Sequence, residues 1–109
     1  MIITTTDTIE GRPTTNVLGM VMANSVRARH VGRDITAALR NLVGGEVEEY
    51  SKLLADSREM AVRRMTERAE AMGANAIVGT RFITAGIMGG AAEILAYGTA
   101  VVVDEADSP

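Results

Sequence analysis

The sequence contains no cysteine and no tryptophan, and aromatic residues occupy only 3% of its 109 positions. Without cysteine, the chain cannot form disulfides, thiolate nucleophiles or Cys-ligated metal sites. Hydrophobic residues nevertheless make up 47% of the chain, so the core must be built from Val, Ile, Leu, Ala and Met. Large exposed areas of such side chains are typical of subunit interfaces.

The sequence also lacks an excess of basic residues and a long apolar segment. Eleven basic and 14 acidic residues give a net charge of −3, whereas a dedicated nucleic-acid-binding domain usually carries a clear basic excess. No apolar run approaches the roughly 20 residues that a membrane helix needs, and no N-terminal targeting signal is visible. We therefore expect a soluble, cytoplasmic protein with neither a nucleic-acid nor a membrane partner.

Hydrophobic periodicity predicts one domain over residues 1–109, with its elements in the order β-β-α-α-β-β. Strands are expected where β-branched and apolar residues run together or alternate, and helices where apolar residues recur every three or four positions. The expected strands cover residues 2–6, 16–29, 75–83 and 93–103, and the expected helices cover residues 35–43 and 46–72. Residues 104–109 are polar and acidic, so we expect this tail to fray.

Apolar positions and glycines predict how these elements are oriented. The expected buried stripe of the long helix is Val47, Tyr50, Leu53, Leu54, Ala61, Met65, Ala69 and Met72. Strict alternation gives the third strand one face with Ala76, Val78, Thr80 and Phe82 and another with Ile77, Gly79, Arg81 and Ile83. It gives the second strand one face with Val17, Gly19, Val21 and Ala23 and another with Leu18, Met20, Met22 and Asn24. Gly73 is expected to end the helix, and Gly19 indicates a bulge or a close backbone approach.

Both faces of the expected strands are largely apolar. An antiparallel sheet with the helices on one face, which is a two-layer α+β sandwich, satisfies the order of the elements. A solitary domain of this kind would keep the second face of its sheet polar. We therefore expect a homo-oligomer in which other subunits cover that face with small apolar side chains.

His30 is the only histidine of the chain, and Asp34 follows it by four residues. Together they are a candidate metal site, although a zinc site needs three or four ligands and the neighbouring arginines would repel a cation. Asp34 also fits the N-cap position of the first helix, where its carboxylate accepts from free backbone N–H groups. The alternative to a metal site is a solvated strand end that leads into this helix.

Arg27, Arg29 and Arg33 surround this histidine and form a candidate anion-binding cluster, because arginines at a helix N-terminus are suited to anions. The alternative is a solvated, charged rim, which the composition favours. Glu93 is a lone carboxylate at the start of an apolar strand. An enzyme site between subunits would have to combine it with Arg27, His30 and Arg33, but no nucleophile or acid partner is evident. We assign no catalytic residue and expect no cofactor.

Several short motifs occur in order along nearly the whole chain. They are Thr4-Thr5-Thr6, Glu10-Gly11, Leu18-Gly19, Val43-Gly44-Gly45, Tyr50, Arg58, Ala61, Met65, Ala69, the stretch 73–79 and Tyr97-Gly98-Thr99-Ala100-Val101. With these motifs the chain resembles the YbjQ-like family of small bacterial and archaeal proteins, which also carry a heavy-metal-binding label. The resemblance implies a compact subunit related to the dodecin-like fold, and a ring-shaped homopentamer joined by additional strand pairing. It implies no settled biochemical activity, and the metal label lacks evident ligands in this chain.

The segment after Phe82 departs from the family pattern because it carries no acidic residue before Glu93. Its apolar side chains form a candidate oligomer or assembly interface that consists of Ile83, Ala85, Ile87 and Met88. Drift within a subfamily accounts for this departure, and so does redesign of a natural pentamer into a larger particle. We expect a non-enzymatic homo-oligomer of unknown biological role. The alternatives are such an engineered assembly, and a metal-ion or small-anion binder that uses inter-subunit sites.

Overall fold

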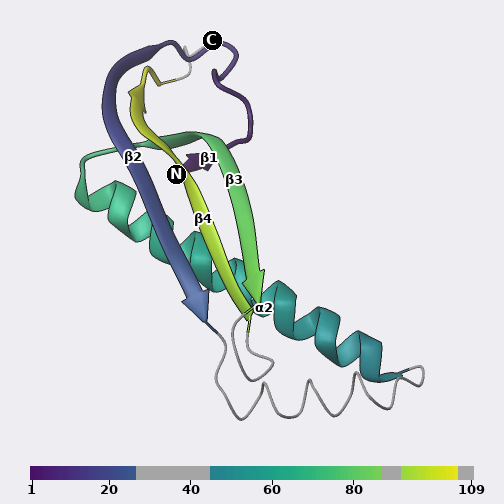
Figure 1. Ribbon diagram of the computed structural model, residues 1–109. Helices are drawn as coiled ribbons and strands as arrows, with labels where there is room; N and C mark the ends of the chain where they lie inside the picture. Colours follow the sequence, from purple (N-terminus) through teal and green to yellow (C-terminus); the bar gives the residue numbers. More distant parts are fainter. Residues whose placement is uncertain (27–44, 87–91, 106–109) are drawn as a thin grey trace.

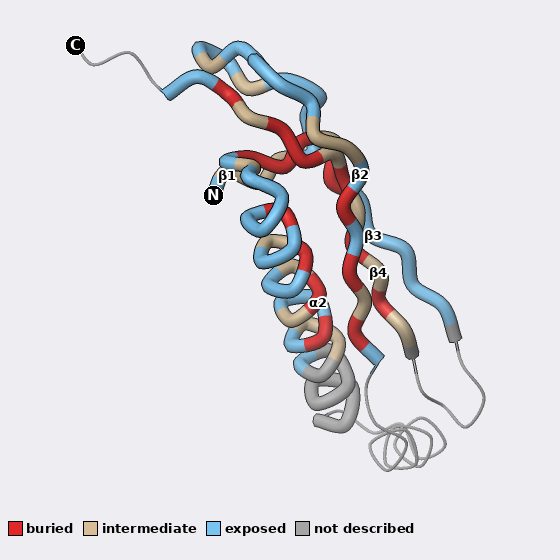
Figure 2. Tube along the Cα trace, turned by 90° about the vertical axis from the view of Figure 1, so that its left-hand side faces the viewer, coloured by how far each residue is buried: buried red, intermediate tan, exposed pale blue. Residues whose placement is uncertain are grey.

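The computed structural model describes residues 1–26, 45–86 and 92–105, which form a two-layer α+β domain. Its elements are β1 (Ile2–Ile3), β2 (Thr14–Val26), α2 (Gly45–Ala71), β3 (Ala76–Gly86) and β4 (Ala92–Val103). The helix α2 runs diagonally across one face of the sheet (Figure 1), and Figure 2 shows the two layers next to each other. The predicted α+β class is confirmed. The predicted helix at 35–43 lies outside the described residues, so the full order of elements stays a prediction.

The four strands form one mixed sheet in the order β1-β3-β4-β2. β4 pairs antiparallel with both β2 and β3, whereas β1 pairs parallel with β3 through Ile2 opposite Ala76 and Ile3 opposite Ile77. The prediction of a purely antiparallel sheet is therefore wrong at β1. Parallel strands need a long connection, and β1 meets that condition because β2 and α2 lie between it and β3 in the sequence.

The helix α2 matches the expected range 46–72 to within one residue at each end. Gly73 follows it with φ +93° and donates its N–H to the carbonyl of Glu70 at 2.9 Å. The N–H of Ala74 donates to the carbonyl of Ala69 at 3.0 Å. These two bonds form a Schellman cap, so the predicted role of Gly73 is confirmed.

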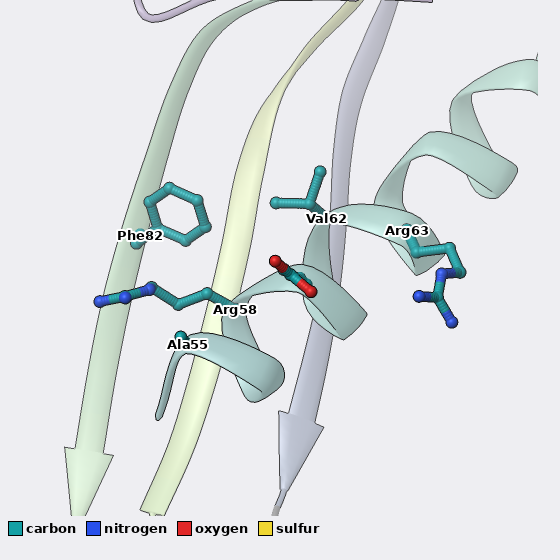
Figure 3. Close-up of a pocket in the computed structure, with 6 residues that line it drawn as sticks. Ala55, Arg58, Val62, Arg63 and Phe82 are labelled. Atoms are coloured by element: carbon teal, nitrogen blue, oxygen red, sulfur yellow. The ribbon is translucent and has the colours of Figure 1, made fainter. Parts of the chain in front are cut away.

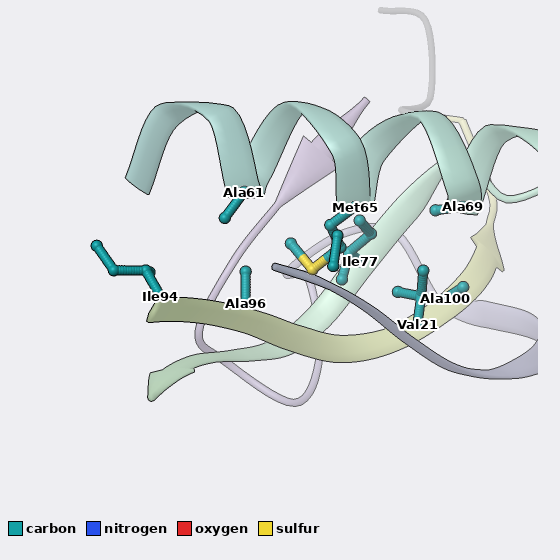
Figure 4. Close-up of a cluster of buried hydrophobic side chains, with 9 residues drawn as sticks. Val21, Ala61, Met65, Ala69, Ile77, Ile94, Ala96 and Ala100 are labelled. Atoms are coloured by element: carbon teal, nitrogen blue, oxygen red, sulfur yellow. The ribbon is translucent and has the colours of Figure 1, made fainter. Parts of the chain in front are cut away.

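The main hydrophobic core lies between α2 and the sheet (Figure 4). Its buried members are Val21, Ala23, Ala61, Met65, Ala69, Ile77, Ile94, Ala96 and Ala100. The helical members are spaced four residues apart, so each turn places one of them on the sheet. Met72 was predicted to continue this stripe, but it is 39% exposed because the helix has ended before it.

A smaller cluster packs on the opposite face of the sheet. It consists of the buried residues Ala76, Val78, Val101 and Val103, with Ile2 and Ile9 packed against them. Ile9 belongs to the connection between β1 and β2, so this connection covers one end of that face. No described segment covers the remainder of this face.

A bulge in β3 changes the side to which its residues point. Residues 79 and 80 together lie opposite a single residue of β4, and Gly79 has φ +61°. A glycine in the left-handed conformation is a recurrent way to insert one extra residue into a strand. Alternation restarts beyond it, so Phe82 pairs with Ala96 of the main core and lies on the helix side. The prediction that Phe82 shares a face with Val78 is therefore wrong, as is the grouping of Ile77 with Ile83.

A second bulge confirms the interruption expected at Gly19. The pairing of β2 with β4 shifts between Val17 and Gly19, and Gly19 has φ +127°. Val17 consequently lies on the side away from α2, together with Met20, and Leu18 packs against the main core. The alternation expected before Gly19 is thus reversed, whereas the alternation expected after it is correct.

Candidate functional site

The sheet surface that faces away from α2 and lies beyond the cover of Ile9 is the candidate functional site. We call it the open face, and its apolar members are Val17, Met20, Met22, Val26, Ile83, Ala85, Leu95 and Tyr97. Residues that pair across antiparallel strands point to the same side of a sheet. The pairs Met22–Tyr97 and Ile83–Leu95 therefore bring side chains from β2, β3 and β4 together.

Large hydrophobic side chains are strongly exposed on the open face. They are Met20 (66%), Val17 (64%), Val26 (50%), Ile83 (50%) and Met22 (39%), which are five of the eight exposed large hydrophobic residues in the described part of the chain. Exposed apolar side chains that are scattered singly are normal. Their concentration on one side of the sheet is instead typical of a surface that another molecule covers.

The polar side chains of the open face are engaged within the subunit. Asn24 Nδ2 donates to Glu93 Oε2 at 3.0 Å, which links the ends of β2 and β4. Arg81 Nη1 donates to the main-chain carbonyl oxygens of Thr5 at 2.9 Å and Thr80 at 2.8 Å. These bonds hold the polar groups in place and leave the centre of the surface to apolar side chains.

A hollow of about 450 Å³ lies on the helix side, between α2 and β3 (Figure 3). It is lined by Ala55, Arg58, Glu59, Val62, Arg63 and Phe82. Phe82 is 48% exposed and reaches this hollow because the bulge turns it towards the helix. The wall offers charge and apolar contact but no Ser, Thr, Cys or His side chain that could act as a nucleophile.

A second hollow of about 350 Å³ lies at the end of the domain where β1 begins. It is lined by Met1, Ile2, Arg12, Asn75 and Glu105. The Asn75 amide is already engaged, because its Nδ2 donates to the carbonyl of Val103 at 2.9 Å and its Oδ1 accepts from the Val103 N–H at 2.8 Å. Asn75 thus fixes the start of β3 to the end of β4, which is a structural role.

The structure places only part of the predicted site residues. Ile83 and Ala85 lie on the open face, and Glu93 lies at its end with a hydrogen bond to Asn24. The other candidates lie outside the described residues, so the hypotheses built on them stay predictions: Arg27, Arg29, His30, Arg33, Asp34, Ile87 and Met88. Among the residues that the structure describes, no three His, Cys, Asp or Glu side chains gather as metal ligands.

The most exposed members of the open face were not among the residues proposed from the sequence. Met20 and Val17 belong to a strand whose two faces are both apolar, so the signal for an interface was present. Strict alternation assigned Val17 to the other face, however, because the displacement caused by the bulge at Gly19 could not be read from the pattern.

Sequence comparison assigns the chain to a family. A family model described as "Putative heavy-metal-binding" matches residues 1–104. The chain belongs to the YbjQ family. The resemblance recognised from the short motifs is therefore confirmed over nearly the whole chain, although the family description states no reaction and no substrate.

Relatives of this YbjQ-family chain are similar along their full length. It is 56% identical to a UPF0145 protein from Methanosarcina acetivorans, over 94% of this chain and 97% of the relative. It is 50% identical to a UPF0145 protein from Clostridioides difficile, over 99% of this chain and 96% of the relative. A crystal structure of a DUF74-family protein of unknown function from Pediococcus pentosaceus matches with a TM-score of 0.64 and 18% identity, and the match covers 95% of this chain and 98% of that one. At this identity the structural match shows the fold alone.

One structural observation bears on the location of the protein. Within the described residues, no helix combines the length and the apolar character that crossing a membrane requires. The cytoplasmic location expected from the sequence stays a prediction.

Proposed function

We propose that this chain is a non-enzymatic subunit of a homo-oligomer and that its copies associate through the open face. The observation that carries the proposal is the concentration of five exposed large hydrophobic side chains on one side of the sheet. Burying such a side chain completely contributes roughly 1.5–3 kcal/mol. Because about half of each is still exposed, an interface would gain on the order of 1 kcal/mol from each of them.

The proposed assembly is a ring of five subunits, a number that comes from the family resemblance and not from contacts within one chain. If two open faces met each other, the contact would be self-complementary and would give a dimer. If the open face met a different surface of the next subunit, the same contact would repeat and could close into a ring. The mass of the intact particle separates these arrangements.

The walls of the two described hollows each contain one carboxylate, Glu59 and Glu105, but no Ser, Thr, Cys or His side chain beside it. The non-enzymatic part of the proposal therefore rests on the open face and not on these hollows. Glu93 accepts a hydrogen bond from Asn24 and belongs to neither hollow.

The proposal is tested by light scattering and native mass spectrometry over a dilution series. We expect a particle of five times the 11.5 kDa chain. We expect Met22→Lys to reduce this mass, because it places an ammonium group in the contact surface. Met72→Lys is the matched control, since Met72 is also 39% exposed but lies after the helix and off the open face. A wild-type chain that stays folded and monomeric at high concentration would overturn the proposal, and a mass of tens of subunits would support the larger assembly instead.

Metal-ion binding is the second candidate function, because the family description itself names it. Its residues would be His30 and Asp34, supplied by several subunits so that three or four ligands meet. The measurement is an equilibrium titration of the assembled protein with Zn²⁺, Cu²⁺ and Ni²⁺, with His30→Ala as the comparison. Binding tighter than millimolar that is lost in His30→Ala supports the metal site, and its absence removes it. A parallel titration with inorganic phosphate tests the arginine cluster.

A further inference from the structure

The outer edge of β2 is a long free edge of the described sheet. β2 spans 13 residues and takes the last place in the strand order, with β4 as its neighbour on one side. Every second residue of an edge strand turns its N–H and C=O groups away from the sheet, and such groups are a template on which another chain can add a strand. A long, apolar edge of this kind is an aggregation hazard unless the structure protects it.

Two arginines of α2 reach this strand. Arg68 Nη1 donates to the main-chain carbonyl oxygen of Met22 at 2.7 Å, and Arg64 Nη1 donates to that of Asn24 at 2.9 Å. Both bonds have a charged donor, which makes them stronger than bonds between neutral groups. Met22 and Asn24 are two residues apart, so their carbonyl groups point to the same side of the strand.

The spacing of the two bonds follows from the geometry of the elements. Residues four apart on a helix lie on the same side and are separated by about 6 Å along its axis. Residues two apart on a strand are separated by about 6.6 Å. Arg64 and Arg68 therefore match Asn24 and Met22 one to one, with the helix and the strand running in opposite directions. The two arginine side chains therefore cover two carbonyl groups on the same side of β2, those of Met22 and Asn24.

We propose that Arg64 and Arg68 close the outer edge of β2 against strand addition by a second copy of this chain. An added strand would direct its own N–H groups at the carbonyl oxygens of Met22 and Asn24, which the guanidinium groups already occupy. It would also have to displace two charged side chains, or pack against them. Strand pairing between copies at the β2 edge is thereby opposed, so any pairing between subunits of the kind that the family resemblance implies would use another edge of the sheet.

This inference is independent of the copy number proposed above, because it predicts a change relative to the wild-type particle, whatever its mass. The test variant is Arg64→Gln/Arg68→Gln, which removes both charges and shortens both side chains. The matched control is Arg58→Gln/Arg63→Gln, which removes two charges from the same helix. Arg58 and Arg63 line the hollow on the helix side and have no hydrogen bond to a described residue of β2.

The readouts are the particle mass by light scattering and the infrared signature of intermolecular β-sheet. We expect Arg64→Gln/Arg68→Gln to grow at least tenfold in mass with a new intermolecular-sheet signal, while the control keeps the wild-type mass. Arg64→Lys/Arg68→Lys retains both charges and donors, so it should stay close to the wild type.

Two results would overturn the inference: an unchanged mass in Arg64→Gln/Arg68→Gln, or equal growth in the control. If the double variant loses the helical circular-dichroism signal of α2, the single variants Arg64→Gln and Arg68→Gln decide by the same criteria, since each keeps one of the two bonds. The outcome is separate from that of Met22→Lys, which reports on the open face and leaves both arginines in place.

Discussion

Phe82 and Ile83 offer a test of the open face within a single strand. The two residues are neighbours in β3 and are almost equally exposed, at 48% and 50%. The bulge at Gly79 nevertheless turns Phe82 to the helix side and Ile83 to the open face. Truncating each side chain to alanine therefore removes a similar exposed apolar surface from opposite sides of the same sheet.

The expected magnitude follows from the exposed part of Ile83. Burying a whole isoleucine side chain contributes roughly 1.5–3 kcal/mol, so the exposed half contributes about 1 kcal/mol to each contact. Since 1.4 kcal/mol corresponds to a factor of ten, Ile83→Ala should raise the dissociation constant of each contact about fivefold. Ile83→Lys should have a larger effect, because it buries a charge without a partner.

The assay is a dilution series followed by light scattering, with circular dichroism to check that each variant is folded. Phe82→Ala should leave the dissociation midpoint within twofold of the wild type. Equal shifts in the two alanine variants would show that the side of the sheet does not matter. No shift in Ile83→Lys would show that the open face is not the contact surface. Either result refutes the reasoning.

Three further predictions concern the stability of the subunit. A Cβ atom at Gly98 would lie 2.8 Å from Ile77 Cγ2 and 3.0 Å from the carbonyl oxygen of Val78. Gly98→Ala should therefore lower the unfolding free energy measured by urea denaturation by about 1–3 kcal/mol. An unchanged denaturation midpoint would contradict the close packing. Ser25 is 1% exposed and its Oγ has no hydrogen-bond partner among the described residues; Ser25→Ala should therefore raise the melting temperature, by an amount equivalent to about 1 kcal/mol, whereas a lower value would mean that the hydroxyl is bonded. Gly73→Ala should cost about 1 kcal/mol because φ is +93°, and Gly73→Asn should cost less in the same thermal measurement.

The features that depend on local sequence could be predicted. The range of α2 follows from the spacing of its apolar residues and from Gly73, whose cap involves only residues within five positions of one another. The alternation of β4 is also correct, because β4 contains no bulge: Ile94, Ala96 and Ala100 join the main core, while Val101 joins the cluster on the other face.

The features that depend on pairing between distant segments could not be predicted from the sequence. β1 is two residues long and lies parallel to a strand more than 70 residues away, and a short apolar segment carries no information about the direction of its partner. The effect of the two bulges could not be predicted either, because a glycine indicates that the alternation of side chains is interrupted but not how the register continues after it. The contacts of Arg64 and Arg68 with β2 required the orientation of α2 across the sheet, which periodicity alone does not fix.

The open face itself was predicted in outline, because too many apolar residues lay on both sides of the strands for one layer of helix to cover. Ile83 and Ala85, which the sequence proposes as interface residues, are exposed on this face. Their role in an interface stays a prediction until the mass of the particle is measured.

The bulge of β3 determines which of its side chains lie on each side of the sheet. In the observed register, the part of β3 after Gly79 places Ile83 on the open face and Phe82 on the helix side. Without the left-handed conformation of Gly79, pairing would slip by one position and the two sets of side chains would exchange sides. Substitutions at Phe82 or Ile83 change one of these surfaces at a time, whereas a β-branched residue at position 79 would disfavour the torsion angle on which both depend. The distribution of side chains between the two sides of this strand is therefore fixed by the backbone at one glycine as well as by the sequence that follows it.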